Sequence, residues 1–488
     1  MKLLGWMFKG LWWAAVAAVP VAGVWIASSM AAYWNGPTWA VALAGALLFP
    51  VLPLTWDLWG TLRRKRRGKT GPRTLTFGDR LILRTLTLNL LFLGPLLYRF
   101  PDTAFTAISG RGDWMLDGRE GPEFDQARAA LFSTADGLEW LYTNTHENPY
   151  AQLAEGGEAP TPTPAPTVTP VPTVQTVASP TADADDTDAI AAPVTEQQVW
   201  PRPSTLHPNV LTVPDDAATL EAVAAHLVDG VTDPYERVKA LHDFVADHVA
   251  YDFENLDAGT RAPQDARAVF ETGRGVCAGY SNLLLAMAES VGEEMVYVTG
   301  DSRDEGGDIA GGGHAWNAAK IDGQWHLIDV TWSAGGRGPD GTFKKDYDTD
   351  WLFTPPQVFV RTHLPDNESW QLMTAPVSRG DFVRAPMLRP AFYAAGLTLT
   401  EPTRSQITVD GVATLTLENP ARTDLRVAFE PRDGGERERC TVKGIDTQEV
   451  TCRFDAEGTY LVYFFLPEAG GGDTYWSGGQ IEVNNSSG

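Results

Sequence analysis

The chain contains the stretch Gly275-Val276-Cys277-Ala278-Gly279-Tyr280, which leads into a series of apolar residues at helical spacing. These apolar residues are Leu284, Met287, Ala288 and Val291. Cys277 is therefore predicted at a helix N-terminus, where the helix dipole and unpaired backbone N–H groups favour a thiolate and can hold an oxyanion. The alternative is a small buried cysteine without chemistry, which is what most free cysteines are.

A second stretch, from His314 to Asp329, is predicted to form a β-hairpin that turns at Asp322-Gly323, a favoured pair for a two-residue turn. In this register Asp329 faces Trp316 and lies diagonally from His314 on the same face of the hairpin. His326 points to the opposite face. The register therefore selects His314, rather than His326, as the partner of Asp329.

A thiolate nucleophile, a histidine base and an aspartate that orients the histidine are the groups that acyl transfer uses. The sequence predicts Cys277, His314 and Asp329 for these three roles. Because an aspartate beside a purely structural histidine would be an awkward buried charge, the pairing favours catalysis over a structural role.

Three motifs carry these residues: Gly-x-Cys-x-Gly-Tyr at 275–280, Gly-His-Ala-Trp-Asn at 313–317, and Trp-His-Leu-Ile-Asp-Val-Thr-Trp at 325–332. Together they resemble the transglutaminase-like core, which belongs to the papain-like cysteine superfamily. The resemblance covers about residues 205–390, supported by Tyr251-Asp252 upstream and His363-Leu-Pro downstream. It implies an α+β domain at 204–390 in which Cys277 forms a thioester with a glutamine or peptide carbonyl.

The resemblance leaves the oxyanion donor open, and Trp316 and Tyr251 are candidates for an oxyanion or substrate contact. We expect no cofactor and no metal. The acidic residues of the Gly- and Asp-rich loop 301–313, and those of 346–350, do not follow a calcium-loop spacing. The β-domains that flank animal calcium-dependent transglutaminases are not recognisable either.

The beginning of the chain is typical of a membrane protein. Among 488 residues with a net charge of −24, residues 1–100 hold 12 Lys/Arg against 2 Asp/Glu. No charged residue occurs over the 47 residues from Gly10 to Trp56. Three transmembrane helices are expected, at about 11–34, 38–59 and 81–99. The acidic remainder makes nucleic acid an unsuitable partner.

The sequence also predicts how the chain is oriented in the plasma membrane. The basic run Arg63–Lys69 lies between apolar segments, so the positive-inside rule places it in the cytoplasm. With three spans, the residues after about 100 are extracytoplasmic; with two, they would be cytoplasmic. We expect a multi-pass protein of the cell membrane whose catalytic domain lies outside.

The remaining segments have distinct compositions. Residues 101–154 are predicted to be a partly helical membrane-proximal region, with Phe124–Leu141 as its best helix. A Pro/Thr-rich and acidic disordered linker follows at 155–203, and an antiparallel β-sandwich at 396–488. In the sandwich a hairpin centred on Asp446 would bring Cys440 and Cys452 face to face, either as a disulfide or as two free thiols.

These features predict a membrane-anchored transglutaminase-like cysteine enzyme that crosslinks, deamidates or cleaves a protein or peptide outside the cell. The expected substrates include components of the cell envelope. The alternative is a non-catalytic envelope scaffold that binds a wall or protein partner. The lipid bilayer is the other expected partner.

Overall fold

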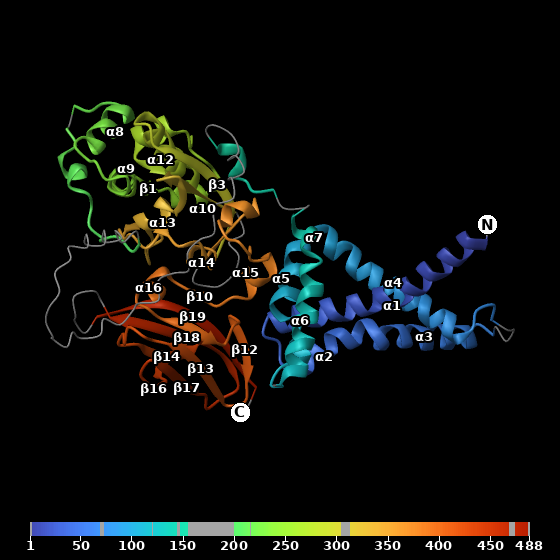
Figure 1. The fold of residues 1–488 in the computed structure, drawn as a ribbon. Coiled ribbons are helices and arrows are strands. Elements are labelled where there is room, and N and C mark those ends of the chain that lie inside the picture. The colour runs from blue at the N-terminus through green and yellow to red at the C-terminus, as the bar shows by residue number, and fades with distance from the viewer. Residues whose placement is uncertain are drawn as a thin grey trace, which may run out of the picture.

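The computed structural model describes residues 2–68, 73–119, 121–143, 147–154, 200–214, 216–303, 313–467 and 474–486. Long helices form a rod, and two lobes lie beyond one end of it (Figure 1). The N-terminus and the connection between α3 and α4 lie at the other end. Nearly all of the predicted linker 155–203 and most of the loop 301–313 fall outside the described residues.

The rod consists of the apolar beginning of the chain. Its elements are α1 (Lys2–Tyr33), α2 (Thr38–Ala46), the π-helical η1 (Leu47–Val51), α3 (Leu52–Arg66) and α4 (Phe77–Arg99). Three segments are long and apolar enough to cross a membrane: Trp12–Tyr33, Thr38–Arg66 and Phe77–Arg99. The third begins four residues before its prediction, because Thr76 and Asp79 form a capping box.

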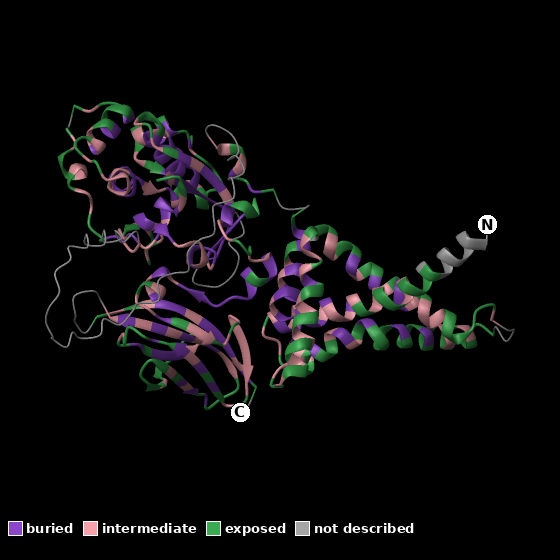
Figure 2. Cartoon of the chain, viewed as in Figure 1, coloured by how far each residue is buried: buried purple, intermediate pink, exposed green. Residues whose placement is uncertain are grey.

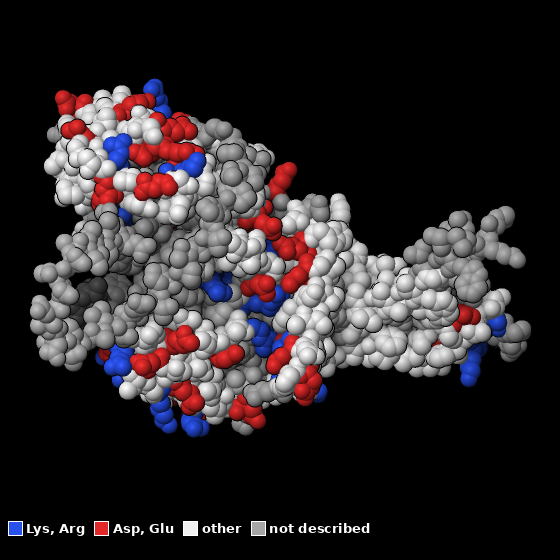
Figure 3. Space-filling view, viewed as in Figure 1, with Lys and Arg blue, Asp and Glu red and all other residues white. Residues whose placement is uncertain are grey.

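Charged side chains are nearly absent from the visible flank of the rod and gather at its far end and over the two lobes (Figure 3). Within the rod, Asp57 of α3 is buried and pairs with Arg84 and, at 2.9 Å, with Arg80 of α4. Pairing offsets the cost of removing these charges from water and holds α3 against α4.

Residues 101–154 are largely helical where the structure describes them and lie between the rod and the lobes (Figure 1). They contain α5 (Pro101–Arg111), η2 (Trp114–Leu116), α6 (Pro122–Asp136), α7 (Glu139–Thr143) and η3 (Ala151–Leu153). The predicted helix Phe124–Leu141 is divided into α6 and α7 at Gly137. Ion pairs join this region to later residues: Asp136 pairs with Arg384 at 3.4 Å, and Asp113 with Arg404 at 2.5 Å.

The first lobe is an α+β domain, and its core lies between helix α12 and a five-stranded antiparallel sheet of order β8-β5-β4-β3-β9. Its helices are η4 (Pro208–Thr212), α8 (Leu220–Val228), α9 (Pro234–His248), α10 (Phe253–Asp257), α11 (Ala266–Thr272), α12 (Cys277–Ser290), α13 (Val330–Ala334), α14 (Pro356–Phe359), η5 (Glu368–Gln371) and α15 (Arg379–Arg384). Its strands are β1 (Ala250–Tyr251), β2 (Arg274–Gly275), β3 (Glu294–Ser302), β4 (His314–Ile321), β5 (Gln324–Ile328), β6 (Gly335–Arg337), β7 (Phe343–Lys345), β8 (Leu352–Thr354) and β9 (His363–Pro365).

The second lobe is rich in strands, arranged as a sheet of six strands and a sheet of four with an apolar core between them. Its elements are β10 (Met387–Leu388), α16 (Pro390–Ala394), β11 (Thr398–Glu401), β12 (Gln406–Val409), β13 (Val412–Glu418), β14 (Arg426–Pro431), β15 (Glu438–Arg439), β16 (Thr441–Gly444), β17 (Thr447–Arg453), β18 (Gly458–Pro467) and β19 (Tyr475–Asn485). Along β18, buried residues alternate with partly exposed ones (Figure 2). The pairing of β16 with β17 brings Cys440 opposite Cys452, and a disulfide joins them.

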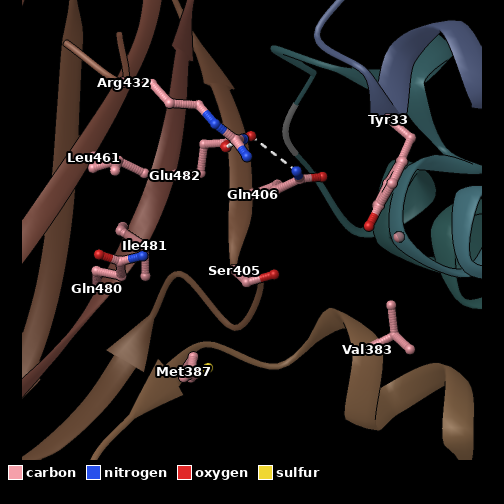
Figure 4. A pocket seen from close by; sticks show the side chains of 11 residues that line it. Tyr33, Val383, Met387, Ser405, Gln406, Arg432, Leu461, Gln480, Ile481 and Glu482 are labelled. Carbon is pink, nitrogen blue, oxygen red and sulfur yellow. Dashed lines mark hydrogen bonds and ion pairs between the residues drawn. The ribbon is translucent and has the colours of Figure 1, made fainter. Parts of the chain in front are cut away.

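A small cavity separates the end of α1 from the second lobe (Figure 4). Tyr33 faces it from α1 and Val383 from α15, and Gln406 donates a 2.8 Å hydrogen bond to Glu482 on its wall. Its volume of about 50 Å³ suits a few water molecules rather than a substrate.

Candidate active site

Cys277 occupies the first position of helix α12, as the sequence predicts. The preceding residue, Val276, donates its backbone N–H to the side chain of Gln264 at 2.9 Å, which fixes where the helix begins. A Cβ added at Gly279 would lie 2.6 Å from Oε1 of Gln264, so the second glycine of the motif makes room for this amide. Since the first N–H groups of a helix have no acceptor within the helix, the amide of Cys277 is available to an oxyanion.

His314 begins β4, and the pairing of β4 with β5 has the predicted register, with Ile321 opposite Gln324. The ladder ends at the pair Asn317–Ile328, so Asp329 leaves the sheet and does not face Trp316. Asp329 instead caps helix α13, where its Oδ1 accepts hydrogen bonds from the backbone N–H groups of residues 331 and 332. Its other oxygen, Oδ2, lies 2.8 Å from Nε2 of His314.

A second histidine, His363 of β9, bonds the same carboxylate oxygen, with Nε2 3.0 Å from Oδ2 of Asp329. Its Nδ1 lies 2.9 Å from the hydroxyl of Thr362, and its ring stacks on Phe359 at 4.1 Å. In the sequence, His363 is only part of a supporting motif, and no role is predicted for it. His363 and Asp329 are 34 residues apart in the sequence, and the pairing of β9 with β3 brings them together. No local sequence pattern reveals this pairing.

The electrostatics favour a charged histidine beside the sulfur. Burial opposes the charged form of His314, but the negative charge and hydrogen bond of Asp329, with a further hydrogen bond to Cys277, raise its pKa to about 10. Burial also opposes the ionised form of Asp329, yet His314 and then His363 hold the pKa of Asp329 below its usual value. Because Nε2 of His314 is engaged by Asp329, Nδ1 is the ring nitrogen left for Cys277.

His363 has the opposite electrostatic character. Its burial lowers its pKa to about 4 against the opposing effect of Asp329, so it is neutral near pH 7. His363 therefore donates a hydrogen bond to the carboxylate without adding a second positive charge. This leaves His314 as the charged partner of Asp329.

Comparison with known proteins indicates the family of this domain. Residues 221–330, which include Cys277, His314 and Asp329, match the sequence profile of the transglutaminase-like superfamily. These residues form a transglutaminase-like domain. The chain is 33% identical to mouse kyphoscoliosis peptidase over 42% of its own length, and 31% identical to the human protein over 42%. In both cases the match spans 32% of the relative, so the chain covers about a third of these proteins.

A solved structure from Cytophaga hutchinsonii, described as a candidate cysteine protease, is also similar in part. It is 21% identical, and the similarity covers 29% of this chain and 47% of that one with a TM-score of 0.21. The family of the domain therefore rests on the sequence profile and the curated relatives.

The structure places the two predicted oxyanion candidates differently around the transglutaminase-like site. Trp316 is completely buried and packs against His363 at 5.2 Å, and its Nε1 has no acceptor among the described residues. Tyr251 lies in β1, beside Gly275 of β2, close to the start of α12. Burial, followed by neighbouring Cys277, raises the pKa of Tyr251, so its hydroxyl remains a donor. Of the two, Tyr251 is the better placed to contact a group bound at Cys277.

Within the described part of the domain, one group of side chains can hold a metal ion: His314, Asp329 and His363, whose ligand atoms lie within 4.8 Å of one another. The observed N···O distances of 2.8 and 3.0 Å are those of hydrogen bonds, and the cluster is buried beside a cysteine. Hydrogen bonds therefore explain why these three side chains lie together without a metal ion. The absence of a metal stays a prediction from the sequence.

His326, the histidine that the register excludes, lies away from the carboxylate. It pairs with Ala319, and its Nε2 lies 3.3 Å from the hydroxyl of Tyr235. Burial lowers its pKa to about 4. His326 thus offers a matched control for His314 on the same hairpin.

Proposed function

We propose that this protein is a membrane-anchored cysteine enzyme that acts outside the cell on amide bonds of proteins or peptides. One observation carries the proposal: inside a transglutaminase-like domain, Asp329 is hydrogen-bonded to His314, whose pKa is raised, against the effect of burial, first by Asp329 and then by the neighbouring Cys277. A charged imidazole stabilises a thiolate, and the carboxylate holds the ring in orientation. A scaffold has no use for this arrangement.

In the proposed reaction, the sulfur of Cys277 attacks the carbonyl carbon of an amide. The C–N bond breaks, the proton of His314 passes to the leaving nitrogen, and a thioester remains. The leaving group is ammonia when the amide is a glutamine side chain and an amine when it is a peptide bond. An amine or water then attacks the thioester, returns a proton to His314 and releases the sulfur.

The second nucleophile decides whether the enzyme crosslinks or hydrolyses. The relatives named kyphoscoliosis peptidase support peptide hydrolysis for this chain, and the transglutaminase-like profile supports transfer to an amine. Both outcomes use the same thioester. We therefore propose formation of this thioester, the step that both reactions share. The product then identifies whether an amine or water reacts with the thioester.

Anchoring in the membrane is supported by the three apolar helices, and the orientation by the arrangement of the molecule. The N-terminus and the end of α3 that carries Arg63–Arg66 lie at one end of the rod, opposite the two lobes (Figure 1). Basic residues are retained in the cytoplasm. The transglutaminase-like domain would then face the outside.

The proposal is tested by product formation from glutamine-containing peptides with the full chain in detergent micelles. Ammonia release, incorporation of a fluorescent amine and peptide cleavage are followed in parallel. We expect Cys277→Ala and His314→Ala each to lose about 10³-fold or more, because both residues act in the same chemical step. His326→Ala, the matched control, should stay within about twofold. Equal product from the wild type and Cys277→Ala would overturn the proposal.

A further inference from the structure

The nucleophile of the proposed enzyme is covered in this structure. Cys277 is only 1% exposed, and the buried Tyr150 lies in the same hydrophobic core. Tyr150 belongs to the membrane-proximal segment Glu147–Ala154, which precedes the transglutaminase-like domain and is separated from Trp200 by residues 155–199. A part of the chain outside the domain therefore packs in the same core as the reactive cysteine.

This segment is held by hydrogen bonds from the elements that form the site. Tyr297 of β3 donates to the backbone oxygen of Tyr150 at 3.0 Å, and Asn282 of α12 donates to that of Leu153 at 2.8 Å. In the reverse direction, Nδ2 of Asn148 donates to the backbone oxygen of Gly300 at 2.8 Å. Two donors of the domain thus bind main-chain carbonyls, which every peptide has.

The side chain of Tyr150 points to the centre of this site. Burial, followed by the neighbouring Cys277, raises the pKa of its hydroxyl, and Arg261 lies 5.2 Å from its ring centroid. Beside it, a cavity of about 220 Å³ is lined by Gln264 and Val276, the residues that fix the start of α12. A phenol offers the sulfur no acyl carbon, so this contact occupies the nucleophile without being cleaved.

We infer that Asn148–Leu153 occupies the groove in which the enzyme binds its peptide substrate, and that this segment closes the active site until it is displaced. The inference rests on the proposed function, because it names the ligand of the same groove: a peptide whose main-chain carbonyls accept hydrogen bonds from Tyr297 and Asn282. Displacement of the segment frees both donors and uncovers Cys277.

The test is the rate of alkylation of Cys277 by iodoacetamide in the full chain, read by mass spectrometry of the peptide that contains it. Tyr150→Ala removes the covering ring and is expected to raise the rate about tenfold or more, since access then needs no local opening. Tyr150→Phe, which loses only the hydroxyl, should give a smaller increase. Gln152→Ala, an exposed position of the same segment, is the matched control and should leave the rate unchanged.

A peptide with the sequence of residues 147–154 supplies a second measurement. Added in large excess to Tyr150→Ala, it competes with the altered segment for the groove and should slow alkylation again, whereas a peptide with alanine in place of the tyrosine should not. This restoration also shows that the variant is folded. Equal alkylation rates in the wild type, Tyr150→Ala and Asn148→Ala would overturn the inference.

The two proposals fail in distinguishable ways. Faster alkylation of Cys277 in Tyr150→Ala, without any amide turnover, would support the closing role of the segment and contradict the proposed enzymatic activity. Amide turnover that depends on Cys277 but is the same in the wild type and Tyr150→Ala would support the enzymatic activity and contradict the closing role of the segment.

Discussion

At the scale of single residues, the pair formed by His314 and Asp329 makes stability depend on pH. The pKa of His314 is raised from 6.5 to about 10, so the folded protein holds a proton that the unfolded chain has lost between these values. Its contribution is complete below pH 6.5 and is lost as the pH rises through about 10. We predict that the melting temperature of His314→Gln falls less steeply than that of the wild type over this range. Parallel curves in a thermal-melting series would contradict the assignment.

Also at this scale, Asp329 shows what a sequence reveals and what it does not. The turn at Asp322-Gly323 sets a register that correctly brings Asp329 to His314. The end of the ladder and the capping of α13 are not encoded in that register, since they depend on how the chain leaves the sheet. His363 and Tyr150 escape the prediction because contacts between distant segments bring them to the site.

At the scale of elements, the start of α12 depends on the close approach of Gln264 to Gly279. A Cβ at position 279 would also lie 2.8 Å from Val269 of α11, so Gly279→Ala must push α11 away or displace the amide. We predict a loss of about 1–3 kcal/mol in the free energy of unfolding, the usual cost of overpacking. Gly336→Ala is the matched control, because its Cβ would meet nothing within 4 Å. Equal melting temperatures for the two variants would show that the approach is not tight.

The elements also differ in how far the sequence predicts them. The three apolar helices and the hairpin of the site are expected from composition and from one turn, both of which are local signals. The division of the predicted helix Phe124–Leu141 at Gly137 is not expected from its apolar spacing. Gly137 stands at the C-cap of α6, and glycine is a poor helix former, so a local signal that the apolar spacing leaves out marks the boundary.

At the scale of the whole molecule, the pair Cys440–Cys452 reports the side of the membrane on which the lobes lie. Disulfides persist in oxidising compartments and are rare in the cytosol. We predict that in acid-quenched cells a bulky maleimide modifies Cys277 alone after denaturation, and all three cysteines after reduction. Two additional modified cysteines without reduction would place the lobes in the cytoplasm and contradict the proposed orientation.

The segment that covers Cys277 and the domain that it covers are parts of one polypeptide, joined through residues 155–199. Contact between tethered partners is governed by an effective concentration and not by the amount of protein in the cell. One cut by a protease within this stretch would remove the covalent connection between them. The two parts would then be held together only by non-covalent contacts, such as the ion pair between Asp136 and Arg384, so a single irreversible cleavage would allow a release that the intact chain reverses.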